Sequence, residues 1–136
     1  MESDVVYRFE NVEIAATART PYIMLDMNQG LIELKGKSIP ENTTKFYWHF
    51  NRWVSEYVCN PNESTTVNIR LSYVNSGSLL VVAGFLKTLL SYGGLQTKLV
   101  VNWYYETGDD DMKDIGIFLN ETTGSKMQIH EVQFLD

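Results

Sequence analysis

The chain has 136 residues, 44% of them hydrophobic, and its 17 acidic and 11 basic residues give a formal net charge of −6. This length suits one domain, and the scattered basic residues exclude a nucleic-acid or anionic-membrane surface. The single cysteine cannot form an internal disulfide, and no apolar run approaches the roughly 20 residues of a membrane span. The acidic first ten residues are unlike a signal peptide, so we expect a soluble cytoplasmic protein that acts on another protein.

The N-terminal part predicts short strands at residues 12–16, 22–27 and 31–35. Pro21 cannot donate a ladder hydrogen bond, which suits the start of a strand or a sheet edge. Asn28–Gly30 has the composition of a hairpin turn between the second and third segments. We therefore expect the fold to open with antiparallel strands.

The next segment predicts a helix that buries one side. Ser38 and Glu41 have the spacing of a capping box, and Pro40 lies near the first turn, where its missing N–H costs little. Trp48 falls on the opposite side with Arg52 near it, either packed under a loop or serving as an interface anchor. The apolar positions recur at helical spacing and form one buried stripe: Phe46, Tyr47, Phe50, Trp53, Val54, Tyr57 and Val58.

A strand and a helix meet in the middle of the chain. Residues 66–74 alternate apolar and polar side chains, as expected of a strand with one buried face. Asn75–Ser78 has the composition of a turn or helix N-cap, and a helical pattern runs over 79–92 to the glycines at 93 and 94. The pattern places a hydroxyl where a strand meets the positive end of a helix.

That hydroxyl has two readings. In the first, Ser76 or Ser78 serves only as the N-cap of the helix. In the second, one of them accepts a phosphoryl group. Such a group adds about −1.5 to −2 charges, which a helix N-terminus tolerates and a docked partner does not. The local sequence leaves both readings open.

The outer arc of the same helix is low and weakly charged. It carries Gly77, Leu80, Gly84, Lys87, Thr88 and Ser91, and an interior glycine costs about 1 kcal/mol relative to alanine. This arc either packs closely against another part of the chain or docks a partner. With Trp48, residues Asn75 to Ser78, Leu80 and Gly84 form the predicted partner-binding surface.

The last third predicts a strand over 95–105, a helix over 112–121 and a strand over 127–134. Both long strands carry polar residues on their second face, whereas a parallel sheet buried on both faces would read as an unbroken apolar run. We therefore expect one α/β domain with a mixed β-sheet and helices mainly on one face.

The acidic run Asp109–Asp111 has two readings as well. Three aspartates can ligate Mg²⁺ or Ca²⁺, but the run lacks the spacing of a calcium loop. Alternatively, Asp110 or Asp111 caps the following helix and complements its dipole. His49 and His130 have no metal-ligand spacing, and no nucleotide or nucleophile motif is present. We expect no metal or cofactor, and an enzyme is the weaker hypothesis.

Several segments together resemble the SiaC family of bacterial regulatory phosphoproteins. The resemblance spans nearly the whole chain in the right order. It rests on Thr17, Thr20 and Pro21; on Gly36, Ser38, Pro40, Glu41 and Asn42; on Trp53 and Tyr57; on Tyr73, Asn75, Ser76 and Ser78; and on Trp103 before the acidic run.

This resemblance implies a non-enzymatic partner switch, similar in layout and logic to STAS-domain anti-sigma factor antagonists. A cognate Ser/Thr kinase would phosphorylate Ser76, a PP2C-type phosphatase would reverse this, and the unphosphorylated form would bind an effector such as a diguanylate cyclase. The family typically has Asn-Thr-Ser-Ser where this chain has Asn75–Ser78, so Ser78 is a rival acceptor. The alternatives are a Mg²⁺-dependent enzyme using Asp109–Asp111 and a constitutive structural subunit.

Overall fold

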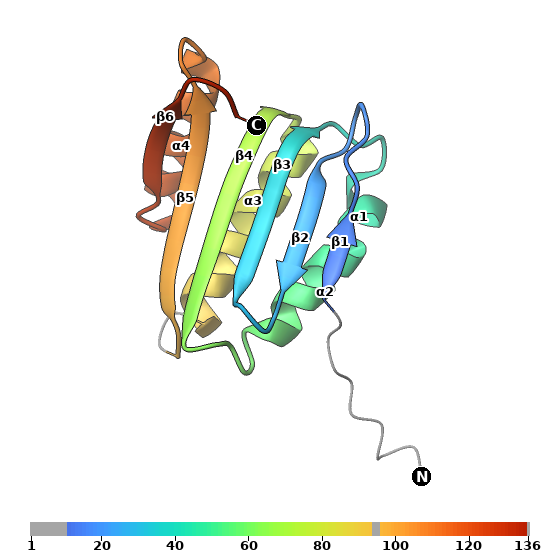
Figure 1. Cartoon of the computed structure of the whole chain (residues 1–136), viewed down its shortest axis with the longest axis vertical. Coiled ribbons are helices and arrows are strands. Elements are labelled where there is room, and N and C mark those ends of the chain that lie inside the picture. The colour runs from blue at the N-terminus through green and yellow to red at the C-terminus, as the bar shows by residue number, and fades with distance from the viewer. Residues whose placement is uncertain (1–10, 94–95, 136) are drawn as a thin grey trace.

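The computed structural model describes residues 11–93 and 96–135, and within them a six-stranded sheet is covered by helices on one face (Figure 1). This confirms the expected α/β domain with a mixed sheet. The strands are β1 (Val12–Ile14), β2 (Tyr22–Asp26), β3 (Leu31–Ser38), β4 (Ser64–Val74), β5 (Lys98–Glu106) and β6 (Gln128–Val132). The helices are α1 (Thr43–Phe46), α2 (Trp48–Tyr57), α3 (Ser76–Thr88) and α4 (Asp110–Thr123).

The strands lie side by side in the order of the sequence. β1, β2 and β3 pair antiparallel, whereas β3, β4, β5 and β6 pair parallel. Each parallel connection contains a helix and moves the chain one strand further in the same direction. Because such crossovers are right-handed, they place every helix on the same face, which is the face behind the sheet in Figure 1.

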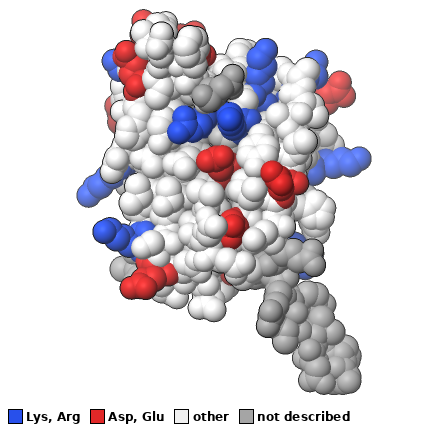
Figure 2. Space-filling view, viewed as in Figure 1, with Lys and Arg blue, Asp and Glu red and all other residues white. Residues whose placement is uncertain are grey.

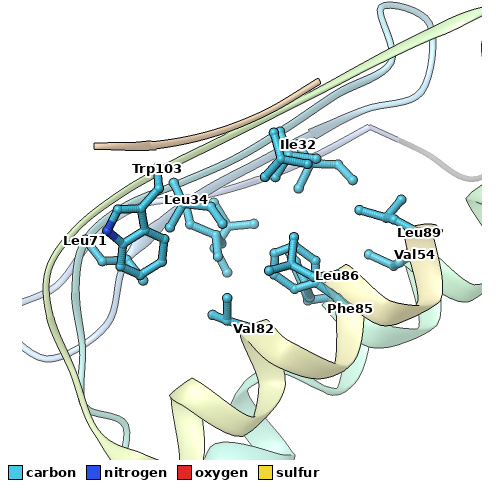
Figure 3. Close-up of a cluster of buried hydrophobic side chains, with 14 of the residues drawn as sticks. Ile32, Leu34, Val54, Leu71, Val82, Phe85, Leu86, Leu89 and Trp103 are labelled. Atoms are coloured by element: carbon cyan, nitrogen blue, oxygen red, sulfur yellow. The ribbon is translucent and has the colours of Figure 1, made fainter. Parts of the chain in front are cut away.

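The core lies between that face and the helices. Trp103 is fully buried, and its indole nitrogen donates to the Met112 carbonyl of α4 at 2.9 Å. Figure 3 shows the strand side chains meeting those of the helices, with the labelled residues Ile32, Leu34, Val54, Leu71, Val82, Phe85, Leu86, Leu89 and Trp103.

The other face of the sheet is open and polar. Figure 2, in the same view as Figure 1, shows acidic and basic side chains interspersed over it. The Arg70 guanidinium lies 3.8 Å from the centroid of the Tyr104 ring, which stacks on His130. The Asn102 side-chain oxygen accepts from His130 Nε2 at 2.9 Å, and the Asn102 side-chain nitrogen donates to the Asn68 side-chain oxygen at 3.0 Å. Such cross-strand pairs stabilise a sheet face that no helix covers.

The first helical region departs from the expected capping box. Asn42, not Ser38, caps α1, because its side chain accepts from the Lys45 N–H at 3.0 Å. Ser38 is instead the buried last residue of β3, paired with Val74 of β4. The expected single helix is also divided at Tyr47 into α1 and α2. All the predicted stripe residues are buried except Phe46, which is partly buried.

Two further expectations change at helix ends. Asp109, not Asp110 or Asp111, caps α4 by accepting from the Met112 N–H at 3.1 Å, and those two acids lie in the first turn. α3 continues into a π-helical turn at Leu89–Gly93, and part of its predicted glycine cap lies outside the described residues. Of the described helices, none has the length and apolar character to cross a membrane.

Candidate docking site at the β4–α3 junction

Asn75 connects β4 to α3 and is the N-cap of the helix. Its side-chain oxygen accepts from the Ser78 N–H at 2.9 Å, and its own N–H donates to the Ser38 carbonyl at 3.0 Å. The reading in which Ser76 or Ser78 is the cap is therefore wrong. An asparagine one residue before the helix reaches the third N–H of the first turn, so the two serines have other environments.

Ser76 is the first helical residue and is exposed. Among the described residues its hydroxyl has no hydrogen-bond partner. A serine that neither caps the helix nor packs in the core adds little to stability. Its hydroxyl is open to solvent and to reaction.

Ser78 lies on the opposite side of the first turn and is fully buried. Its hydroxyl accepts from the Ser38 hydroxyl at 2.7 Å, and Ser38 lies 2.6 Å from the Tyr47 hydroxyl. Burial raises the pKa of Tyr47, an effect that its hydrogen bonds with Ser38 and Ser78 partly offset. The three hydroxyls tie the end of β3 and the start of α2 to α3.

The two glycines of α3 differ in their surroundings. A Cβ on Gly77 would lie 2.5 Å from Thr43 Oγ1 and 3.2 Å from Thr43 Cβ, whereas a Cβ on Gly84 would meet nothing within 4 Å. Gly77 thus permits the close approach of α1 and α3, in agreement with the close-packing reading. Gly84 is exposed and keeps the outer surface of α3 low.

A groove of about 460 Å³ runs between α2 and α3. Gly77, Leu80 and Gly84 line its α3 side, together with Thr88. Leu80 is 75% exposed, which is unusual for a leucine beside a groove. Of the predicted surface on α3, the structure therefore brings together Gly77, Leu80 and Gly84, whereas Ser76 and the fully buried Ser78 do not line the groove.

Trp48 does not line this groove. It is 51% exposed and lines a separate hollow of about 1010 Å³ with Arg19, Lys45 and Phe46. The Arg52 guanidinium lies 5.5 Å from the Trp48 ring centroid, so the predicted neighbourhood of the two residues is confirmed. Trp48 is exposed rather than tucked under a loop, but it stands apart from Leu80 and Gly84.

In the acidic run, Asp109 caps α4 through the hydrogen bond that it accepts from the Met112 N–H. Within residues 11–93 and 96–135, no three His, Cys, Asp or Glu side chains gather in a way that could hold a metal ion. Asp110 and Asp111 lie in the first turn of α4, where acidic side chains complement the helix dipole.

Two basic residues near the junction were not among the predicted site residues. Arg19 and Lys37 line a hollow that Asn75 also lines. Arg19 belongs to a loop closed by the hydrogen bond between Thr17 and Thr20, and Lys37 follows Gly36. Both lie within segments that carried the family resemblance, which is the signal by which sequence reasoning could have found them.

Comparison with known proteins places this geometry in a family. Residues 14–132 match the model of the SiaC family regulatory phosphoproteins. An uncharacterised protein of Pseudomonas aeruginosa (strain UCBPP-PA14) is 24% identical over 77% of this chain and 83% of its own length. A chain in the crystal structure of diguanylate cyclase SiaD with its activator SiaC, from P. aeruginosa, superposes with a TM-score of 0.82 at 21% identity, covering 89% of this chain and 99% of that chain. Apo-SiaC of P. aeruginosa superposes with a TM-score of 0.79 at 20% identity, covering 90% and 99%. The chain therefore belongs to the SiaC family of regulatory phosphoproteins.

Proposed function

We propose that this protein is a non-enzymatic, cytoplasmic partner switch controlled by phosphorylation of Ser76. The observation that carries the proposal is the exposed Ser76 hydroxyl, which has no hydrogen-bond partner among the described residues and lies one turn before the exposed Leu80. Family membership supports a regulatory phosphoprotein. In the unphosphorylated form, the α2–α3 groove and the junction residues Asn75 and Ser76 bind an effector, while the predicted contact residue Ser78 is fully buried and takes no part.

The effector that we propose is a diguanylate cyclase. Support comes from the similarity in fold to SiaC, which has been crystallised with the diguanylate cyclase SiaD as its activator. The exposed Leu80 and the low surface at Gly84 suit an apolar contact made by an α-helix or loop of the effector. Trp48 lines the neighbouring hollow, which shares Thr44 with the groove, and an effector that covers both would also contact Trp48.

A phosphoryl group on Ser76 would act through the cost of burying its charge. In the free protein the dianion lies at the N-terminus of α3, where the helix dipole favours it. In the complex the same group must lose water beside an apolar surface, which is costly unless the partner supplies a cation. A difference of about 3 kcal/mol weakens binding more than a hundredfold.

We propose two further partners, a Ser/Thr kinase and a PP2C-type phosphatase. The kinase would form the bond between Ser76 Oγ and the γ-phosphorus of ATP, with loss of the hydroxyl proton and release of ADP. The phosphatase would hydrolyse that bond with water. The full burial of Ser78, and its bond with Ser38, support Ser76 rather than Ser78 as the acceptor.

The test is capture of partners from the native cell with the wild-type protein, Ser76→Ala and Ser76→Asp as baits. The captured cyclase is identified by mass spectrometry, purified, and assayed for cyclic-di-GMP synthesis with each form added. Intact mass of the native protein, with fragmentation, locates any phosphate.

We expect the cyclase to bind the wild type and Ser76→Ala but not Ser76→Asp, and its rate to change only with the forms that bind. We also expect part of the native protein to carry one phosphate at Ser76. Equal binding of all three forms, with no phosphate found, would make the protein a constitutive subunit and would refute the switch.

A further inference from the structure

A hollow of about 530 Å³ lies at the carboxyl ends of β3 and β4, beside the junction. Arg19, Lys37, Ser72, Tyr73 and Asn75 are among the residues that line it. In sheets with parallel strands, ligands bind beyond the carboxyl ends of the strands. This hollow is distinct from the α2–α3 groove, with which it shares no lining residue.

An irregularity in the pairing of β3 with β4 shapes the hollow. Gly36 pairs with Leu71 and Lys37 with Tyr73, so Ser72 is an extra residue on β4 without a partner on β3. Such bulges are rare between parallel strands and commonly re-aim side chains next to functional sites. Here the bulge places Lys37, Ser72 and Tyr73 around one hollow.

The loop that carries Arg19 is held against the same edge. The Arg19 carbonyl accepts from the Ile39 N–H at 2.8 Å, and the Thr17 hydroxyl accepts from the Arg19 N–H at 3.2 Å. Asn75 is fixed there as well, because its side-chain amide donates to the Pro40 carbonyl at 3.4 Å. Hydrogen bonds therefore hold the backbone around the hollow in place without a ligand.

The charge of the hollow is positive in an acidic protein. Arg19 and Lys37 contribute two cations, and none of the described lining residues is acidic. Within the described part of the chain, the ion pair present joins Arg52 to Glu56, so neither cation of the hollow is neutralised by a carboxylate. Two cations that no described carboxylate pairs with suit a small oxyanion such as a phosphoryl group.

The proposed function supplies such a group at Ser76, which is not itself a lining residue of the hollow. It follows Asn75, which lines the hollow, and consecutive Cα atoms lie about 3.8 Å apart. We propose that the hollow receives the phosphoryl group carried by Ser76, with Arg19 and Lys37 as its counter-ions. This inference rests on the proposed function for the presence of the phosphate, and it names the residues that read it within the same chain.

The consequence is a phosphorylated form with a defined structure. The group is held beside Asn75 at the start of α3, where Arg19 and Lys37 partly neutralise its charge but its bulk remains next to the docking surface. The loop that carries Arg19 also borders the hollow of Trp48, because Arg19 lines both. Phosphorylation would therefore alter the surface at Arg19 as well as at Ser76.

The test installs phosphoserine at position 76 during translation, so that no kinase is required. The second ionisation of the phosphate is titrated by ³¹P NMR in the otherwise unchanged chain, Arg19→Gln, Lys37→Gln and the control Lys87→Gln. Lys87 is an exposed cation in the last turn of α3. The helix N-terminus acts equally on all four proteins, so differences between them report the side chains.

We expect the pKa of the phosphate to lie below its usual value of about 6. Arg19→Gln and Lys37→Gln should each raise it by several tenths of a unit, because an opposite charge nearby favours the dianion. Lys87→Gln should leave it unchanged. Circular dichroism of each variant confirms folding, which substitution of exposed side chains should not disturb.

If Arg19→Gln and Lys37→Gln titrate like the unchanged chain, the phosphate does not occupy the hollow and the inference is wrong. The same result follows if inorganic phosphate, added to the unphosphorylated protein, shifts Arg19 and Lys37 resonances while phosphoserine at position 76 does not. Neither outcome touches the release of the effector by phosphate, which the capture experiment decides separately. Conversely, a shifted titration with no loss of effector binding would refute the switch and keep the hollow.

Discussion

The Ser38 hydroxyl donates a hydrogen bond to the Ser78 hydroxyl at 2.7 Å, across the parallel pair formed by the ends of β3 and β4 and into the first turn of α3. Both side chains are fully buried. The two serines of the junction therefore have opposite roles, with Ser78 structural and Ser76 exposed.

This difference predicts opposite effects of alanine substitution. Ser78→Ala should lower the free energy of unfolding by about 1–3 kcal/mol, because it leaves the buried Ser38 donor without its partner. Ser76→Ala should change stability by less than about 0.5 kcal/mol, yet abolish phosphate incorporation in the cell. Urea unfolding measures the first effect and intact mass the second. A stable Ser78→Ala protein that no longer carries phosphate would contradict the assignment.

Tyr47 predicts a dependence of stability on alkaline pH. Burial places its pKa above the ordinary value of about 10. Above that pH the unfolded chain has lost the tyrosine proton while the folded chain retains it, so the unfolded state binds fewer protons and the free energy of unfolding falls as pH rises. The contribution of Tyr47 to the free energy of unfolding is fully present below about pH 10 and is lost as the pH rises through the pKa of Tyr47 in the folded chain.

Tyr47→Phe should therefore flatten the alkaline fall in stability and also cost about 1 kcal/mol at neutral pH through the lost hydrogen bond to Ser38. Urea unfolding between pH 8 and about pH 11 measures both effects. Tyr73→Phe, at an exposed tyrosine, is the control. Identical pH profiles for wild type and Tyr47→Phe would show that Tyr47 does not titrate differently in the two states.

The two glycines of α3 predict opposite responses to alanine. Gly84→Ala should raise the free energy of unfolding by about 0.5–1 kcal/mol, because the new Cβ meets open space and alanine favours the helix. Gly77→Ala should lower it by about 1–3 kcal/mol, because its Cβ would overlap Thr43. Thermal unfolding compares them. Thr43→Ala should restore part of the loss, and equal stability of the two glycine variants would refute the close contact.

The exposed Leu80 predicts a loss of binding without a loss of stability. Leu80→Glu should weaken binding of the captured effector more than tenfold, because a charge would be buried in an apolar contact. Its unfolding free energy should change by less than about 0.5 kcal/mol, since the side chain is 75% exposed. Phe118→Glu is the matched control on α4, where Phe118 is 52% exposed. Equal weakening by both substitutions would place the interface elsewhere.

Substitutions of Asp109 distinguish a role in helix capping from a role in metal binding. Asp109→Ala should cost about 0.5–2 kcal/mol, whereas Asp109→Asn keeps a side-chain acceptor and should cost little. Neither the wild type nor these variants should gain thermal stability on addition of Mg²⁺. A Mg²⁺-dependent rise in the melting temperature, lost in Asp109→Asn, would favour the metal-dependent enzyme instead.

Periodicity in the sequence identified most of the strands, the helices and their buried faces. The alternation was wrong at Tyr73, which it placed on the apolar face of β4 and which is 57% exposed, because the extra residue Ser72 shifts the pairing with β3. Val67, Ile69 and Leu71 on β4, like Val101 and Trp103 on β5, are buried as their alternation predicted. These predictions succeed because the direction of a side chain follows from local backbone geometry, and the apolar face must enter the core. The exact caps were less accessible, because Asn, Ser and Asp neighbours at each junction all have capping chemistry.

The environment of each junction residue was decided by tertiary structure. Ser76 and Ser78 both carry a hydroxyl and lie two positions apart. The packing of Ser38 and Tyr47 against α3 buries Ser78 and leaves Ser76 exposed. The sequence by itself determined a hydroxyl at a strand–helix junction and the family resemblance around it. The approach of Arg19 and Lys37 to that junction required the folded chain, because parallel pairing and a bulge bring together residues distant in sequence.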